Sequence, residues 1–373
     1  MARTKPGCDR ALDRELCAWF RERARPLPWR RTPRDPYLSL VSEYMLQQTQ
    51  VSRVLEKFGP FTSRFPTLAA LASAGVDDVL AEWSGLGYYR RARHLHACAR
   101  AIAERHGGVV PAGVPELMGL PGIGRYTAGA IASIVYNRPA PIVDGNVARV
   151  LLRVRGERAP QVEGMAFAWR QAEALAGASR DVAAFNEGLM ELGATVCTPA
   201  RPRCGECPIS GLCAARARGE QDQIPAPKAA AVRSTLHMAC VVVRDRRGRV
   251  LLEKRPETGL WAGLWQPPTV ESSRWRPTRD VVIEALGAEG LRRVGAFAHT
   301  TTHRDVQFTV YGAERGAVVG RRWFTPAEAA GLAMGNPQRR MVGGGFGSKA
   351  LVPGTSSLHS SAPASGYSSS SSK

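Results

Sequence analysis

The chain has 373 residues, enough for two ordinary domains that each bury a hydrophobic core. Its 51 lysine and arginine residues outnumber 32 acidic residues and give a net charge of +19. That excess favours a polyanionic partner such as nucleic acid, although an arginine-rich genome would produce it too. No apolar run approaches the ~20 residues of a membrane span, and residues 1–25 lack the apolar stretch of an export signal. We therefore expect a cytoplasmic protein without a membrane partner.

Residues 9–215 show the periodicity of one amphipathic helix after another. Apolar side chains recur every three or four positions in residues 12–20 and again in residues 37–44. The runs are interrupted where proline and glycine cluster. This pattern predicts an all-α domain, which we place at residues 1–220.

Residues 114–135 contain a glycine-rich turn between two helical segments. A short helix over Val114–Met118 precedes the sequence LPGIG, and a second helix follows it. Gly122 and Gly124 permit a tight hairpin with exposed backbone N–H groups, to which the second helix adds its positive end. Such a helix-hairpin-helix binds the DNA backbone without reading sequence. A glycine-rich turn that only joins two packed helices is the alternative.

Two carboxylic acids occupy positions that suit acid–base chemistry. Asp144 begins a predicted helix as its N-cap, a role that structure alone would explain. Glu43 lies inside an otherwise apolar helix beside Tyr44 and Met45, where partial burial should raise its pKa and let it hold a proton. A protonated acid together with an ionised carboxylate is what cleavage of a glycosidic bond requires.

Four cysteines follow the spacing C-x6-C-x2-C-x5-C. Four thiolates within seventeen residues can enclose one metal centre. A zinc ribbon usually has two separated C-x2-C pairs, so the single pair here favours a [4Fe-4S] cluster in a compact loop over residues 197–213. A four-thiolate zinc site and four unrelated buried thiols are the alternatives, and thiolate ligands indicate a reducing compartment. The predicted ligands are Cys197, Cys204, Cys207 and Cys213.

The pattern changes after a Pro/Ala-rich linker at residues 221–234. Short β-rich runs at 238–243, 248–252 and 308–311 alternate with helical stretches at 281–286 and 326–332. Residues 235–335 are thus predicted to form a small α+β domain. The Ser/Gly-rich residues 336–373 are predicted to be a disordered tail.

Several stretches in order resemble the adenine DNA glycosylase (MutY) family: LPWR, SEYMLQQTQV, GLGYYRRAR, LPGIGRYTAGA and VDGNVARVL, followed by the cysteine loop. The similarity covers residues from about 10 to 225. It implies a monomeric enzyme that removes adenine mispaired with 8-oxoguanine or guanine in double-stranded DNA, using Glu43 to protonate the base. Asp144 would stabilise or trap the deoxyribose cation. Tyr126 and Asn146 would shape the site, and the adenine pocket would be formed by Trp29, Arg30 and Glu187.

The resemblance also implies how the duplex is held. The target nucleotide must leave the base stack, because neither its base nitrogen nor C1′ is accessible inside the helix. Tyr88 would wedge into the duplex, and Gln47 and Gln48 would fill the gap left by the flipped nucleotide. The hairpin contacts would come from Leu120, Gly122 and Gly124.

One position separates this interpretation from endonuclease III-type enzymes, which share the fold, the cluster and the hairpin. Those enzymes carry a catalytic lysine in the second helix of the hairpin, where this chain has Tyr126. A phenol forms no Schiff base, so strand-cleaving lyase activity is disfavoured and a monofunctional glycosylase is expected. A catalytically silent DNA-binding iron–sulfur protein is the third possibility.

Residues 235–330 resemble the Nudix-like recognition domain of the same family. Residues 259–268 match its tryptophan-rich turn, but the glutamate-rich helix that would hold magnesium is missing, so the domain is expected to bind rather than hydrolyse. The family's lesion-sensing loop, Phe-Ser-His, is represented by Phe297, Ala298 and His299. Alanine lacks the hydroxyl that would contact 8-oxoguanine, for which Thr300–Thr302 are a candidate replacement. The alternative for Phe297 and His299 is a strand end that packs on its own core.

Overall fold

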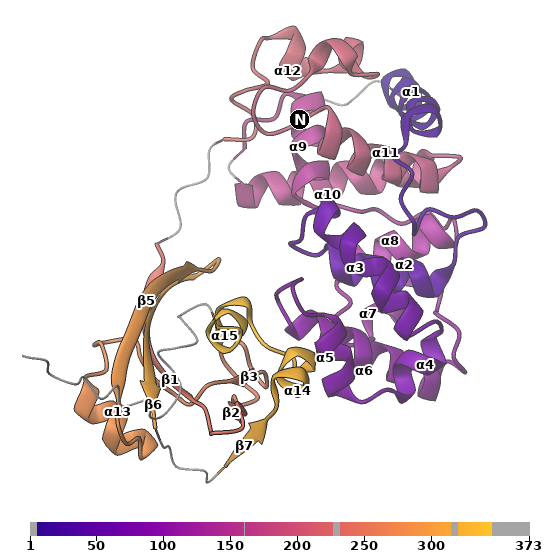
Figure 1. Ribbon diagram of the computed structural model, residues 1–373. Coiled ribbons are helices and arrows are strands. Elements are labelled where there is room, and N and C mark those ends of the chain that lie inside the picture. The colour runs from indigo at the N-terminus through magenta and orange to yellow at the C-terminus, as the bar shows by residue number, and fades with distance from the viewer. Residues whose placement is uncertain (1–5, 160, 227–231, 315–319, 345–373) are drawn as a thin grey trace, which may run out of the picture. The chain divides into compact units, whose positions relative to one another are not determined.

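The computed structural model describes residues 6–159, 161–226, 232–314 and 320–344 (Figure 1). The chain folds into two compact units. Among the described residues, one unit holds 6–159, 161–226, 232, 256–264 and 333–335, and the other holds 233–255, 265–314, 320–332 and 336–344.

The first unit is helical throughout, as the periodicity predicted. Its α-helix α8 continues directly into a π-helical turn, η1, a distortion that is frequent at functional sites. The elements are α1 (Pro6–Arg23), α2 (Pro36–Leu46), α3 (Val51–Arg64), α4 (Leu68–Ser73), α5 (Val76–Glu82), α6 (Arg90–Arg105), α7 (Val114–Met118), α8 (Arg125–Ala130), η1 (Ile131–Val135), α9 (Gly145–Arg155), α10 (Gln161–Ala178), α11 (Val182–Thr195), η2 (Cys204–Glu206), η3 (Ser210–Leu212) and α12 (Ala214–Ala217).

Local sequence sets where several of these helices begin. The side chains of Asp35, Thr67, Asp144 and Asp181 each accept a hydrogen bond from a backbone N–H in the first turn of the helix that follows, which compensates for the missing intrahelical acceptor. The predicted N-cap role of Asp144 is therefore confirmed.

Two hydrophobic clusters support the helical unit. One is built largely from α2 to α8 and has Phe58, Phe61 and Trp83 at its centre. The other gathers α1, α9, α10 and α11 around Leu16 and Phe185. The α8–η1 helix contributes buried residues to both clusters and therefore lies where they meet. Side chains from α2 can approach side chains from α9 and α11 beside this helix.

The second unit contains two β-sheets, as expected for an α+β domain. The first has the order β4-β1-β6-β5, with β1 parallel to β6 and the other pairs antiparallel; the second has the order β3-β2-β7. The elements are β1 (Ser234–Val243), β2 (Val250–Lys254), β3 (Trp265–Gln266), β4 (Thr269–Ser272), α13 (Arg279–Leu286), β5 (Arg292–Thr300), β6 (Arg304–Ala313), β7 (Arg321–Phe324), α14 (Pro326–Gly331) and α15 (Asn336–Val342).

Several boundaries differ from the predicted ones. The strand expected at 308–311 runs over Arg304–Ala313, because pairing with both β1 and β5 extends it. The predicted disordered tail begins too early at 336: residues 336–342 form α15, which buries Met341 completely. The rest of that tail, 345–373, lies outside the described residues, as do residues 227–231 of the predicted linker. No helix in the described ranges combines the length and apolarity of a membrane span.

Candidate active site

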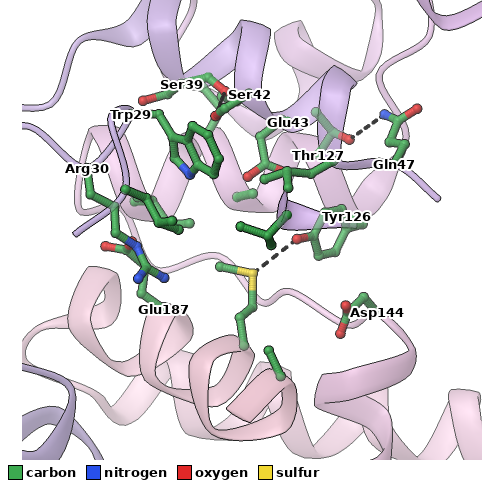
Figure 2. Close-up of a pocket in the computed structure, with 18 of the residues that line it drawn as sticks. Trp29, Arg30, Ser39, Ser42, Glu43, Gln47, Tyr126, Thr127, Asp144 and Glu187 are labelled. Atoms are coloured by element: carbon green, nitrogen blue, oxygen red, sulfur yellow. Dashed lines mark hydrogen bonds and ion pairs between the residues drawn. The ribbon is translucent and has the colours of Figure 1, made fainter. Parts of the chain in front are cut away.

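A cavity of about 540 Å³ lies in the helical unit among α2, α8–η1, the start of α9 and α11. Figure 2 shows Glu43 directed into it, with Trp29, Arg30 and Glu187 toward one end and Tyr126 and Asp144 toward the other. Of the residues that the sequence singled out, the cavity wall contains Trp29, Arg30, Glu43, Gln47, Gln48, Gly124, Tyr126, Asp144, Asn146 and Glu187.

Glu43 projects from α2, whose neighbouring residues Ser42, Tyr44 and Met45 are almost fully buried. Burial, followed by repulsion from the carboxylates of Asp144 and Glu187, raises the pKa of Glu43 from 4.5 to about 8. The carboxyl group is therefore mostly protonated at neutral pH. This confirms the desolvation that was predicted from its apolar surroundings.

Asp144 is fixed at the start of α9. Its Oδ1 accepts a hydrogen bond from the backbone N–H of Val147 at 2.7 Å, and its Oδ2 accepts one from Nδ2 of Asn146 at 3.1 Å. Both donors and the positive end of α9 stabilise a negative charge there. The segment before Asp144 packs tightly on α8 at Gly129, where a Cβ atom would lie 2.2 Å from the carbonyl oxygen of Pro141.

Tyr126 stands between the two carboxyl groups. Its hydroxyl donates a hydrogen bond to Sδ of Met190 at 3.1 Å. Burial, and then the charges of Glu43 and Asp144, raise the pKa of Tyr126 well above its ordinary value of 10. The side chain is thus a neutral phenol that is close enough to both acids to interact with them electrostatically.

Two buried carboxylates and three arginines form the other end of the cavity. Glu187 accepts hydrogen bonds from Nε of Arg30 at 3.0 Å and from Nη2 of Arg34, while Glu191 accepts from Nη2 of Arg30 at 2.9 Å and from Arg25. The pairing keeps Glu187 fixed as a hydrogen-bond acceptor. The sequence prediction missed Arg34 and Glu191, although the four-residue spacing on α11 places Glu191 on the same helix face as Glu187.

The predicted duplex-contacting residues lie at the end of α2 and in the loop before α6. Gln48 and Tyr88 have left-handed backbone conformations, with φ of 55° and 45°, which non-glycine residues adopt at a cost that is often found at functional sites. The side chain of Tyr88 is 45% exposed. Gln47 faces the cavity and donates to Oγ1 of Thr127 at 3.4 Å.

Arg91 connects these two segments, and the sequence prediction missed it. It is 7% exposed, and burial lowers its pKa to about 10. A signal was available, because Arg91 shares a helical face with Leu95, Cys98 and Ile102 of α6. Its guanidinium donates to the carbonyl oxygens of Tyr44, Met45, Gln47, Leu86 and Gly87 and to the hydroxyl of Thr49.

The hairpin has the expected conformation, with a different role for each residue. Gly122 has φ of +76°, which favours glycine, whereas Gly124 has φ of −95° and instead leaves open space before α8. Among the described residues, neither N–H group has a hydrogen-bond acceptor. Leu120 is 4% exposed, its N–H donates to the carbonyl oxygen of Leu117, and its own carbonyl oxygen accepts from the N–H of Ile123. The DNA contact predicted for Leu120 therefore stays a prediction.

Arg149 links the Asp144 end of the cavity to the cysteine loop. Its Nη2 donates to Oδ1 of Asn146 at 2.9 Å and to the carbonyl oxygen of Gly193 at 2.7 Å, while its Nε donates to the carbonyl oxygen of Cys197 at 2.8 Å. Asn146 in turn binds Asp144. This link depends on three separate segments, so it could not be predicted from the sequence.

The four predicted cysteine ligands surround one hollow beside η2 and η3. Within the described residues, no three His, Cys, Asp or Glu side chains are arranged to hold a metal ion. The donor set nevertheless fits a thiolate-bound cluster, because all four sulfurs lie close enough to interact electrostatically. Nη1 of Arg153 also donates to Sγ of Cys197 at 3.3 Å, the kind of contact that stabilises cluster-bound thiolates.

In the second unit, Phe297, Ala298 and His299 lie within strand β5 rather than on the predicted loop. Pairing with β6 extends the strand to Thr300, and the ring of Phe297 stacks on Phe308 with centroids 4.6 Å apart. Phe297 and His299 are half-buried, Ala298 is exposed, and burial lowers the pKa of His299.

Comparisons with known proteins agree with this architecture. Residues 41–172 match the HhH-GPD superfamily of base excision DNA repair proteins, and residues 239–343 match the NUDIX domain. Human adenine DNA glycosylase is 36% identical over 84% of this chain and 70% of its own length. The adenine DNA glycosylase of Mycobacterium tuberculosis is 44% identical over 56% of this chain and 68% of its own length. The solved structure of a thermostable thymine-DNA glycosylase, 27% identical, covers 57% of this chain and 98% of its own, with a TM-score of 0.52.

The helix-hairpin-helix fold and the superfamily match define a base-excision DNA glycosylase, an enzyme that hydrolyses N-glycosidic bonds. The identity to relatives along most of the chain is more specific. The chain belongs to the adenine DNA glycosylase family, with a Nudix-like domain after the helical core.

Proposed function

We propose that the protein removes adenine paired with 8-oxoguanine or guanine from double-stranded DNA by hydrolysing its N-glycosidic bond. The observation that carries this proposal is one cavity in which Glu43, with its pKa raised to about 8, faces Asp144 at the start of α9. A proton donor and a fixed carboxylate on opposite sides of a glycosidic bond are the two groups that its hydrolysis needs.

The proposed reaction begins when Glu43 transfers its proton to a ring nitrogen of the flipped adenine. The C1′–N9 bond then breaks, its electron pair stays with the base, and an oxocarbenium ion remains on the sugar. Asp144 stabilises that cation, and water adds to C1′ with loss of a proton. Asn146 orients Asp144 through its 3.1 Å hydrogen bond, and the neutral Tyr126 separates the two acids.

Adenine recognition would use the opposite end of the cavity. Both carboxylate oxygens of Glu187 are held by arginines, so the group accepts hydrogen bonds and donates none. This chemistry suits the exocyclic amino group of adenine. Trp29, 7% exposed, offers an aromatic surface beside it.

The hairpin and the cysteine loop have proposed roles in binding the DNA duplex and the metal. The free N–H groups of the hairpin would bind a backbone phosphate, while Tyr88, Gln47 and Gln48 would occupy the site of the flipped nucleotide.

A [4Fe-4S] cluster would tie the cysteine loop to the helical core. Its ligands would be Cys197, Cys204, Cys207 and Cys213. Iron and sulfide analysis of anaerobically prepared protein tests this assignment. Four irons per chain are expected, and one zinc would contradict it.

In the Nudix-like domain, Phe297 and His299 would read the base opposite the adenine.

A single-turnover assay on duplexes that pair adenine with 8-oxoguanine, guanine, cytosine or thymine tests the function directly. Adenine release should be fastest opposite 8-oxoguanine and then guanine. Borohydride trapping should give no enzyme–DNA adduct, because the chain has Tyr126 where a lyase needs an amine. Absence of adenine release from any duplex would refute the proposal.

A further inference from the structure

The first two turns of α6 carry an arginine and a histidine that the catalytic cavity does not use. Arg90 follows the exposed Tyr88 loop and is itself exposed, while Arg91, the next residue, turns inward and anchors the helix. Nε of Arg90 donates a hydrogen bond to Nε2 of His94 at 3.4 Å, one helical turn later. The guanidinium is therefore held in one direction on the surface of the helical unit.

This pair adjoins the hairpin although the two segments are far apart in the sequence. A Cβ atom on Gly122 would lie 2.6 Å from Cβ of His94 and 2.7 Å from its Nδ1. The histidine ring thus packs directly on the hairpin glycine. Gly122 has a positive φ and an N–H group without an acceptor among the described residues.

The charge of Arg90 is not neutralised by a carboxylate. Within the described ranges no ion pair involves it, whereas Arg100 on the same helix pairs with Glu104 at 3.6 Å, and Arg53 on α3 pairs with Glu56. An exposed arginine is usually only solvated. Here His94 orients the Arg90 guanidinium and the hairpin lies beside the pair, so an anion bound at the hairpin would be attracted by the positive charge of Arg90.

We propose that Arg90, oriented by His94, binds a DNA backbone phosphate next to the one held by the hairpin. This inference rests on the proposed DNA-binding function and adds a second phosphate site to it. Two phosphate contacts from separate elements fix the direction of the strand as well as its position, which one contact does not do.

The experiment measures the affinity of the full-length protein for an undamaged duplex as a function of salt concentration. Each neutralised phosphate contributes about 0.9 to the slope of log K against log salt. Arg90→Ala should make the slope shallower by about 0.9 and weaken binding about eight-fold at ~0.1 M salt. Arg105→Ala is the matched control, because Arg105 is exposed at the far end of the same helix.

His94 variants examine the orienting role. His94→Ala should make the slope of log K against log salt shallower than in the wild type. His94→Gln keeps a hydrogen-bond acceptor for Arg90 and should restore the wild-type slope. An unchanged slope in Arg90→Ala, or an equal change in Arg105→Ala, would overturn the inference.

Adenine release at saturating enzyme separates this inference from the proposed function. The control residue Arg105 lines neither the cavity nor the proposed phosphate site, so the single-turnover rate of Arg105→Ala should match that of the wild type. Failure of the wild type to release adenine would refute the glycosylase proposal and leave the salt-slope result standing on its own.

Discussion

The cavity of the helical unit and strand β5 of the second unit are held in place by different kinds of contact. In the cavity, two of the acidic groups have several partners: Asp144 is held by Val147 and Asn146, and Glu187 by two arginines. On strand β5, Phe297 stacks on Phe308, the guanidinium of Arg340 lies over its ring at 4.8 Å, and the strand backbone pairs with β6.

The difference reflects what each region would have to do. Bond cleavage requires groups whose position and protonation are fixed in advance, because reorganisation during the reaction is costly. Reading a base requires side chains that the base can reach, and Phe297 and His299 are half-buried while Ala298 is exposed. Strand β5 has the exposed Ala298 where the family pattern has serine. The predictions below test whether the two regions really differ in this way.

The largest effect is expected for Glu43→Gln. The amide keeps the shape of the carboxyl group but has no proton to transfer, so single-turnover adenine release should fall by ~10²-fold or more while duplex affinity is retained. In the wild type, the rate should fall as pH rises through about 8, because the active form of Glu43 is the protonated one. A variant that keeps more than about a tenth of the rate would remove Glu43 from the acid role.

Arg91→Met tests whether the backbone segments beside the cavity are held as firmly as its acidic side chains. The change leaves six oxygen acceptors without their donor, and we expect a loss of about 3 kcal/mol in the free energy of unfolding. Urea denaturation measures it. Arg105→Met, an exposed change on the same helix, is the control and should alter stability by less than about 0.5 kcal/mol.

Glu43→Gln should also stabilise the fold, in a pH-dependent manner. The folded pKa of about 8 lies above the ordinary 4.5, so between these values the folded protein binds more protons than the unfolded chain. Wild-type stability therefore falls as pH rises from about 4.5 to about 8, and the variant lacks this loss. The variant should be about 2–4 kcal/mol more stable at pH 8 and equal near pH 4. Parallel stability curves for the two proteins would contradict the raised pKa.

Features that depend on local sequence could be predicted without the structure. Helical periodicity placed Glu43 among buried neighbours, and capping chemistry placed Asp144 at the start of α9. Both predictions depend only on residues within one helical turn of the side chain concerned. The hairpin was equally predictable, because the conformation of Gly122 is a local property.

Features created by tertiary contact could not be predicted in the same way. Arg149 acquires its role only because Gly193 and Cys197 lie beside α9 in the folded chain. Helix α15 has few apolar residues and lies in a Ser/Gly-rich context, so burial of Met341 stabilises a segment that composition alone predicted to be disordered. The extension of β5 to Thr300 likewise depends on its pairing with β6.

The smallest effect is expected for Ala298→Ser, which restores the hydroxyl of the family pattern. Thr300 and Thr301 are poor replacements, since their hydroxyls already donate to Oδ1 of Asp305 and to the carbonyl oxygen of Arg304 within the β5–β6 turn. The serine should therefore improve discrimination between 8-oxoguanine and guanine opposite adenine by up to about 1 kcal/mol, or about five-fold in relative rate.

Ala296→Ser provides the control for that measurement. Ala296 is exposed on the same strand two residues earlier, so its side chain projects from the same face of the sheet as that of Ala298. A gain confined to Ala298→Ser would show that one exposed position of β5 tunes lesion reading. Equal gains at both positions would mean that added polarity, and not a specific contact, is responsible. No change at either would mean that β5 does not read the base through this face, and recognition would then have to be sought on another surface of the second unit.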